Sequence, residues 1–184
     1  MNLLAHLRTA TRAAHRALED ELGFLERLDS ADRYAEVLAA FLGFHEPLEK
    51  ALDASIAAHH LPWELLPGAE LLAADLRGLG WSSAGIASLP RADPPDVTEL
   101  PELVGSLYVV EGARLGGRVI TRWAGAALGP VPVSFFASGG DVRRRLRRFA
   151  AVAEEALAAE QVEAAGAAAD RHFRIFGDWL RALG

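Results

Sequence analysis

The sequence lacks cysteine entirely, has a single methionine and contains no long apolar run. The absence of cysteine excludes disulfides, zinc–thiolate sites, iron–sulfur clusters and a cysteine nucleophile. Apolar residues make up 51% of the 184 residues, yet no stretch approaches the roughly 20 consecutive apolar residues of a membrane span. The first residues also lack the apolar segment and cleavage site of a secretory signal. We therefore expect one cytoplasmic domain, 1–184, with no membrane span.

Basic residues are fewer than acidic ones, and the formal net charge is -6. This balance argues against nucleic acid as a partner. One basic cluster departs from it, formed by Arg143, Arg144, Arg145, Arg147 and Arg148. On a helix such a cluster is usually a solvated face, and the alternative is a surface that attracts carboxylates or an acidic protein.

Alternating patterns and β-branched runs are scarce, whereas Ala, Leu, Glu and Arg are abundant, so we predict an all-α fold. The expected helices are about 2–23 capped by Asn2, a helix from Ser30 that bends at Pro47, 68–79, a glycine-bearing helix capped by Thr98, an arginine-rich helix capped by Asp141, and about 160–183. Residues 80–96 and 129–140 are expected to be connecting loops. Short links between helices indicate a single-domain multi-helix bundle.

The glycine-bearing segment, Gly105 to Trp123, has helical apolar spacing but contains Gly112, Gly116 and Gly117. Each glycine inside a helix costs about 1 kcal/mol relative to alanine. A kink, the close approach of a neighbouring helix, or the close approach of a flat ligand would each account for this cost. The residues alone leave all three explanations open.

His15 is the most informative of the six histidines. At 100° per residue, it falls at the margin of the apolar face of the first helix, on the same side as Arg8, Arg12 and Glu19. A metal-binding imidazole usually has its other nitrogen oriented by an acceptor, and Glu19 lies one turn further on. The two arginines could hold carboxylates of the same ligand. The alternative is a histidine at the edge of the core.

The other histidines give weaker indications. His59 and His60 lie near a helix C-terminus and are expected to be solvated, and His6 is expected to be exposed. His45 could reach a pocket, while the pattern does not fix the side of the helix on which His172 lies. The absence of a Glu-x-x-His motif disfavours a di-iron bundle, and no phosphate-binding glycine loop occurs.

Two motifs together resemble a known family. LRTATRAAHRALED, Leu7 to Asp20, is similar to the proximal helix of the haem oxygenases, particularly of the bacterial biliverdin-producing branch, and EGARLGGRVITRW, Glu111 to Trp123, is similar to their glycine-bearing distal helix. Weaker similarity covers FLGFHEPLEKAL and RHFRIFGDWL. The order of these segments along the chain is consistent with the family.

The resemblance implies a role for each matching residue. His15 would be the proximal iron ligand with Glu19 as its partner. The residues near the haem propionates would be Arg8 and Arg12, and less directly Arg122 and Arg143 to Arg148. The distal backbone would come close to haem at Gly112, Gly116 and Gly117, and the pocket would be lined by Phe173 and Phe176. One position departs from the family pattern, because Ala113 stands where many members have an aspartate that orders water. Backbone carbonyls, Glu111, Arg114 and His45 would then be candidates to hold that water.

The implied reaction is the oxidative opening of haem b, which is both substrate and cofactor, to biliverdin, CO and ferrous iron. It requires O2 and electrons from an external donor of the ferredoxin, flavodoxin or reductase type, and a bilin-accepting protein is a further implied partner. Two alternatives remain open. One is a haem carrier or sensor without turnover, suggested by Ala113, and the other is a thiaminase-like protein that shares the fold without binding haem.

Overall fold

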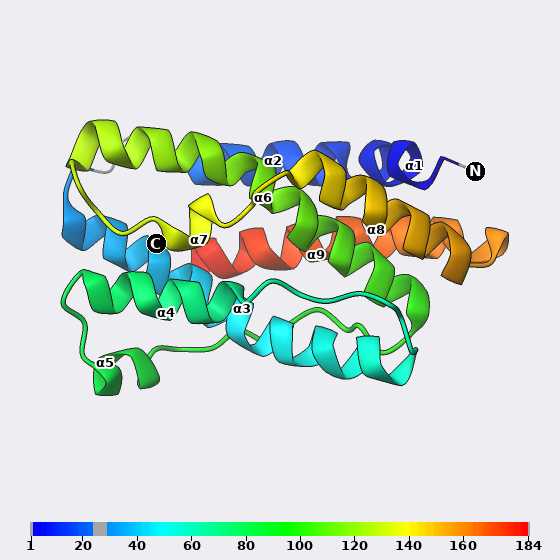
Figure 1. The fold of residues 1–184 in the computed structure, drawn as a ribbon, viewed down its shortest axis with the longest axis horizontal. Helices are drawn as coiled ribbons and strands as arrows, with labels where there is room; N and C mark the ends of the chain where they lie inside the picture. The colour runs from blue at the N-terminus through cyan, green and yellow to red at the C-terminus, as the bar shows by residue number, and fades with distance from the viewer. Residues whose placement is uncertain (1, 24–28, 184) are drawn as a thin grey trace.

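The computed structural model describes residues 2–23 and 29–183, and within these ranges it contains helices and loops but no strand (Figure 1). The elements are α1 (Leu3–Ala10), α2 (Arg12–Leu22), α3 (Ala31–Ala58), α4 (Gly68–Gly78), α5 (Ser83–Ala87), α6 (Leu100–Leu128), α7 (Ser134–Ala137), α8 (Val142–Ala156), the 3-10 helix η2 (Ala159–Gln161) and α9 (Val162–Leu183). The all-α prediction is confirmed. No helix in the described part is long and apolar enough to cross a membrane.

The prediction of one continuous N-terminal helix is wrong, because α1 and α2 meet at Thr11. The Thr11 hydroxyl donates a hydrogen bond to the Leu7 carbonyl at 2.8 Å, and Thr9 makes the equivalent bond to Ala5 at 2.9 Å. Hydroxyls that bond back to the preceding turn bend helices. Asn2 caps α1 as predicted, by accepting from the backbone N–H of Ala5.

Two of the other predicted caps are confirmed and one is wrong. Ser30 and Asp141 cap α3 and α8 through their side-chain oxygens. The N-cap of α6 is Glu99, not Thr98. The hydroxyl and backbone N–H of Thr98 both bond to the carboxylate of Asp96, so this side chain is engaged with the preceding turn instead of the helix.

Both expected loops contain a short helix that the sequence pattern did not predict. α5 lies within 80–96 and α7 lies within 129–140. Each is too short to show a helical apolar period. The last helix begins at Val162, because η2 occupies the residues before it.

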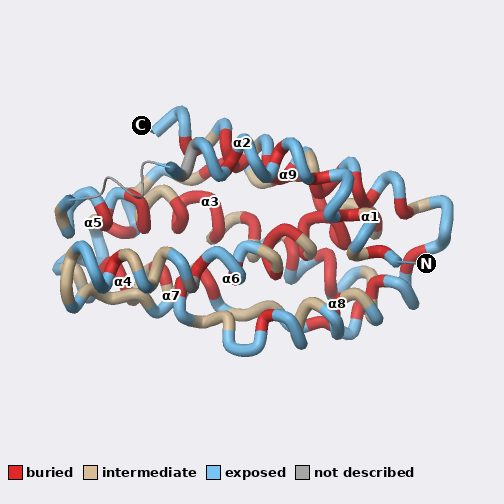
Figure 2. Tube along the Cα trace, turned by 90° about the horizontal axis from the view of Figure 1, so that it is seen from above, coloured by how far each residue is buried: buried red, intermediate tan, exposed pale blue. Residues whose placement is uncertain are grey.

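The long helix α6 is the central element of the bundle. It packs against α9 most extensively and also against α8, α7 and α3 (Figure 1). Buried positions lie on the inward sides of the helices (Figure 2). α3 continues through Pro47 to Ala58 and supplies fully buried side chains such as Leu48 and Leu52.

The two halves of α6 have different surroundings. In the first half, Leu103, Val104 and Leu107 are completely buried. In the second half, Leu115 is 45% exposed and Val119 is 67% exposed. The rest of the bundle therefore covers the second half of α6 less completely than the first half.

Candidate functional site

A cavity of about 490 Å³ lies beside the second half of α6, between α2, α3, α7 and α9. Its volume lies within the range of roughly 300–1,000 Å³ that is typical of small-molecule sites. Aromatic side chains make up much of its wall, namely Phe41, Phe44, Phe135, Phe136, Phe173 and Phe176. Phe135 and Phe136 come from α7, a helix too short for its apolar spacing to be recognised in the sequence.

His15 and Glu19 both line this cavity from α2. The His15 Nδ1 lies 3.4 Å from a Glu19 carboxylate oxygen. The edge of the imidazole meets the ring of Phe173, with 5.3 Å between centroids. The side chain is 53% exposed, so it lies at the open side of the cavity and is not a core histidine. With Nδ1 facing Glu19, Nε2 is the nitrogen that can bind a metal.

All three glycines line the cavity from α6. At Gly112 and Gly116 an added Cβ would meet no neighbouring atom within 4 Å, and both residues line the cavity. At Gly117 the Cβ would lie 2.5 Å from the carbonyl oxygen of Phe136. Close packing therefore explains Gly117, whereas Gly112 and Gly116 leave the helix backbone open to a ligand. α6 is one continuous helix, but its ribbon changes direction about midway (Figure 1), so a bend also remains an explanation for the glycines.

Two buried histidines contribute to the cavity wall. His45 reaches the cavity from α3, as predicted, and His172 lines it from α9. The pKa of each is lowered to about 3, mainly by burial, with a smaller contribution from Arg114 for His45 and from His45 for His172. Both imidazoles are therefore neutral at pH 7. The position of His172 could have been inferred from sequence, because it shares the helical spacing of Ala165, Ala169 and Phe176.

Of the other polar groups proposed from sequence, Arg114 lines the cavity but Glu111 does not. Glu111 is completely buried and accepts hydrogen bonds from Trp63 at 3.2 Å and from Arg145 at 2.7 Å. Arg114 donates to the Ser138 hydroxyl at 2.8 Å, and its burial lowers the pKa of its guanidinium. Glu111 is thus engaged by partners behind the cavity wall.

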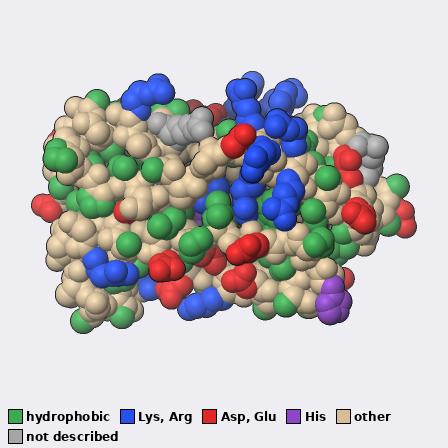
Figure 3. Space-filling view, viewed as in Figure 1, with side chains coloured by type: hydrophobic (Ala, Val, Ile, Leu, Met, Phe, Trp, Pro, Cys, Tyr) green, Lys and Arg blue, Asp and Glu red, His purple; other side chains and the backbone are tan. Residues whose placement is uncertain are grey.

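The arginines suggested as propionate contacts do not line the cavity. Arg8, Arg12 and Arg122 are exposed, and Arg145 is held by Glu111 and lies over the Trp63 ring at 4.6 Å. The remaining members of the cluster are exposed on α8, namely Arg143, Arg144, Arg147 and Arg148. Arginine and lysine side chains gather over this part of the molecule (Figure 3).

The expectation that His6 is exposed is wrong, because α1 packs on α9. His6 is half-buried, and its Nε2 lies only 2.8 Å from where a Cβ on Gly166 would be. His60 is exposed as expected. His59 is partly buried, and a ring nitrogen lies 2.8 Å from the Thr98 carbonyl oxygen.

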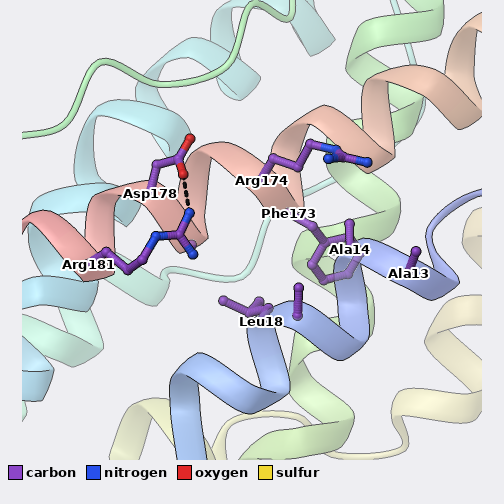
Figure 4. A pocket seen from close by; sticks show the side chains of 9 residues that line it. Ala13, Ala14, Leu18, Phe173, Arg174, Asp178 and Arg181 are labelled. Carbon is purple, nitrogen blue, oxygen red and sulfur yellow. Dashed lines mark hydrogen bonds and ion pairs between the residues drawn. The ribbon is translucent and has the colours of Figure 1, made fainter.

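A smaller hollow of about 280 Å³ lies on the other side of Phe173, between α2 and α9 (Figure 4). Leu18 and Phe173 line both spaces and so form part of the wall between them. The charged side chains at its rim are paired within α9, where Arg174 bonds to Asp170 at 2.7 Å and Asp178 bonds to Arg181.

Comparison with known proteins connects this architecture to one family. The Heme oxygenase family model matches residues 1–182. A heme oxygenase of Xanthomonas campestris pv. campestris (strain 8004) is 35% identical over 96 residues, which are 50% of this chain and 53% of that protein. The match thus spans about half the length of this curated relative. The structure of a heme oxygenase from Leptospira interrogans has the same fold, with a TM-score of 0.79 over 99% of this chain and 100% of that one, at 19% identity.

Proposed function

The chain belongs to the haem oxygenase family, and we propose that it binds haem b between α2 and α6 and cleaves it to biliverdin, CO and ferrous iron. The observation that carries this proposal is the pair of facing walls. His15 stands on one wall with its Nδ1 directed to Glu19, and the other wall has Gly112 and Gly116, where no side chain and no neighbour fills the space.

The residues present fit haem better than they fit a bare metal ion. Within the described ranges there is no group of three or more His, Cys, Asp or Glu side chains placed to hold an ion. A haem iron already has the ring nitrogens as ligands and needs only an axial side chain, which is a histidine in several haem proteins. His15 supplies that ligand, and the aromatic walls suit an apolar ring.

When bound, haem supplies the oxygen chemistry. The residues of the chain bind it, orient it and restrict water. Glu19 holds the His15 ring through Nδ1, while Gly112 and Gly116 let the ring approach the α6 backbone. Phe173 and Phe176 cover the apolar part of the ring. For the propionates, Arg8, Arg12 and Arg122 are proposed from the family resemblance, and their exposed side chains would have to turn toward the cavity mouth.

Electrons would come from a separate donor of the ferredoxin, flavodoxin or reductase type, since the sequence has no motif for a nicotinamide or flavin. Such donors would need a docking surface. The exposed arginines of α8 form a basic surface on an otherwise acidic protein (Figure 3). Arg145 links the same helix to Glu111, the residue before Gly112. We propose this surface as the donor contact.

The proposal is tested by titrating the protein with haem and then adding O2 and a reductant system in the presence of catalase, which removes free peroxide. We expect a Soret band that decays while biliverdin absorption grows. His15→Ala should lose the histidine-ligated spectrum and the turnover, whereas His60→Ala, an exposed matched control, should behave as the wild type.

Two other results would replace the proposal. A stable haem complex that stays intact with a competent donor would identify a carrier or sensor, an alternative favoured by Ala113, which lines the cavity without offering a carboxylate. A protein that gives no Soret band at all would belong to the thiaminase-like alternative.

A further inference from the structure

The short helix α7 supplies two aromatic side chains to the cavity although it has only four residues. It lies between α4 and α6 (Figure 1). One helical turn forms too few hydrogen bonds to be stable alone. Its N-cap residue is Val133, whose side chain cannot accept a hydrogen bond from the first turn. The groups that hold α7 in place must therefore come from other parts of the chain.

Asp75 on α4 supplies the cap that α7 lacks. Its side chain is 1% exposed. One carboxylate oxygen accepts from the backbone N–H of Ser134 at 3.0 Å, and the other accepts from that of Phe135 at 3.0 Å. The first N–H groups of a helix have no partner within the helix, and hydrogen bonds to an ionised carboxylate are stronger than neutral ones. Asp75 therefore fixes the start of α7.

Two further hydrogen-bonded contacts hold the segment from α3 and α6. The Tyr34 hydroxyl donates to the Pro132 carbonyl at 2.9 Å. The Arg114 guanidinium donates to the Ser138 hydroxyl at 2.8 Å, and that hydroxyl donates to the Phe135 carbonyl at 2.7 Å. Three helices thus hold α7, and Asp75 is the one side chain among these that makes two direct bonds to its first turn.

The two rings of α7 have well-defined positions in the cavity wall. Phe135 meets His45 edge-on at 5.1 Å between centroids, and Phe136 meets Phe41 edge-on at 5.6 Å. The two rings also meet each other edge-on at 5.1 Å. A haem ring is not symmetric about its rim, because its propionates lie on one edge and small apolar substituents on the others. A wall in a fixed position therefore favours one rotation of the ring over the rest.

We propose that Asp75 is a positioning residue that determines, through α7, how haem is rotated in the cavity. Asp75 does not itself line the cavity. The proposal rests on the proposed function, because the rotation of the ring decides which meso carbon is cleaved and hence which biliverdin isomer forms.

The first test needs no haem and measures amide hydrogen exchange at Ser134 and Phe135 by NMR, relative to buried amides of α6. Asp75→Ala removes both acceptors, whereas Asp75→Asn keeps the shape of the side chain and one acceptor oxygen. We expect exchange to become at least about tenfold faster at both amides in Asp75→Ala and at one amide in Asp75→Asn. Unchanged relative exchange in Asp75→Ala would show that Asp75 does not hold α7 and would overturn the proposal.

The second test measures the rotation of bound haem. Proton NMR of the ferric cyanide complex resolves the haem methyl signals of each orientation, and chromatography separates the biliverdin isomers. We expect the ratio of minor to main orientation to rise about tenfold in Asp75→Ala, equivalent to about 1.4 kcal/mol, and by less in Asp75→Asn. The ratio of minor to main isomer should change in parallel.

Glu154→Ala is the matched control. The Glu154 carboxylate accepts from the Leu3 backbone N–H at 2.8 Å, so it holds the start of α1 as Asp75 holds the start of α7. Neither residue lines the cavity. We expect Glu154→Ala to lower stability without changing the orientation of haem.

A merely structural role for Asp75 predicts a different result. The orientation ratio would then stay at its wild-type value in both Asp75 variants, or Glu154→Ala would change it equally, and either result rejects the proposal. If Asp75→Ala does not fold, Asp75→Asn and Tyr34→Phe form the same comparison. A wild type that binds haem without cleaving it would reject the proposed turnover, and the cyanide complex would still test Asp75. A wild type that binds no haem would reject the proposed function, while the exchange measurement still decides whether Asp75 fixes α7.

Discussion

The two halves of α6 both contain glycine but have different surroundings. In the first half, Gly105 lies against α9 so closely that a Cβ would be 2.5 Å from the Ala165 carbonyl oxygen and 2.8 Å from the Ala169 nitrogen. Further along α6, Gly112 and Gly116 line the cavity, and nothing lies within 4 Å of a Cβ added at either position. The same residue type thus permits helix contact at one end of a helix and access for a ligand further along.

This difference shows that a glycine in a helix cannot be interpreted from sequence spacing alone. All these glycines carry the same conformational cost of about 1 kcal/mol. Close packing offsets this cost at Gly105 and Gly117, whereas at Gly112 and Gly116 no atom lies within 4 Å of an added Cβ and ligand access is the proposed compensation. Substitution by alanine distinguishes the two classes, because the added methyl group either collides or enters open space.

The largest effect is expected for Gly105→Ala. Its methyl group would press on the α9 backbone, and overpacking of this kind costs about 1–3 kcal/mol. We expect the free energy of unfolding to fall by about 2 kcal/mol in urea denaturation. Gly125→Ala is the matched control, since Gly125 is exposed on the same helix with no atom within 4 Å. If both substitutions have the same effect, the packed half is not as tight as described.

The two buried histidines that line the cavity should make the stability of the protein depend on pH. The folded-state pKa values of His45 and His172 are about 3, below the usual 6.5, so the unfolded chain binds more protons between these values. Stability should therefore fall as pH decreases below 6.5, by up to about 1.4 kcal/mol per pH unit for each histidine. Burial raises the pKa of Glu49, so its protonation on acidification favours the folded state and contributes with the opposite sign.

Urea denaturation from pH 6.5 to pH 5 measures this slope. The slope should be reduced by about half in His45→Phe or in His172→Phe, and His60→Gln should retain the wild-type slope. An unchanged slope in both phenylalanine variants would mean that these imidazoles are solvated and can be protonated in the folded protein.

The smallest change in stability is expected for Gly116→Ala. The ligand-free protein should gain up to about 1 kcal/mol, because alanine is the better helix former and its methyl group meets nothing. The dissociation constant for haem should rise at least about tenfold, or 1.4 kcal/mol, because the methyl group occupies the space that the ring would use. Gly125→Ala should give the gain in stability without the loss of haem affinity. If Gly116→Ala binds haem with unchanged affinity, the haem ring does not lie against α6 at this position.

The sequence predicts the long helices well because their buried faces repeat at helical spacing and their ends have strong caps at Asn2, Ser30 and Asp141. The prediction of helix ends fails where a threonine hydroxyl has two possible hydrogen-bond partners nearby. The Thr11 hydroxyl bonds to the Leu7 carbonyl at the point where α1 and α2 meet. The Thr98 hydroxyl bonds to Asp96 and therefore does not cap α6. α5 and α7 are missed because four or five residues are too few to show a period.

The candidate site is predicted in part. His15, Glu19, the glycines and the two phenylalanines of α9 are brought together as expected. The contributions of Phe135 and Phe136 depend on where the short helix α7 is placed in the bundle, which is a tertiary property, whereas the helical spacing of α9 could have indicated that of His172. The same holds for Glu111, whose local pattern suggested a cavity residue, whereas contacts with Trp63 and Arg145 keep it behind the wall.

The position of α2 has a mechanical consequence. This helix carries His15, takes its main tertiary support from α9 and faces α6 across the cavity. A ligand held by His15 on one side and by the α6 backbone on the other would connect α2 to α6. The folded protein would then become more stable as the ligand occupies the cavity. Under the proposed function, loss of iron from the ring would remove the link between the ligand and His15. Bound substrate would hold α2 and α6 in fixed positions, whereas bound product would not. Product release would then follow from the greater mobility of α2 and would not require a separate lid.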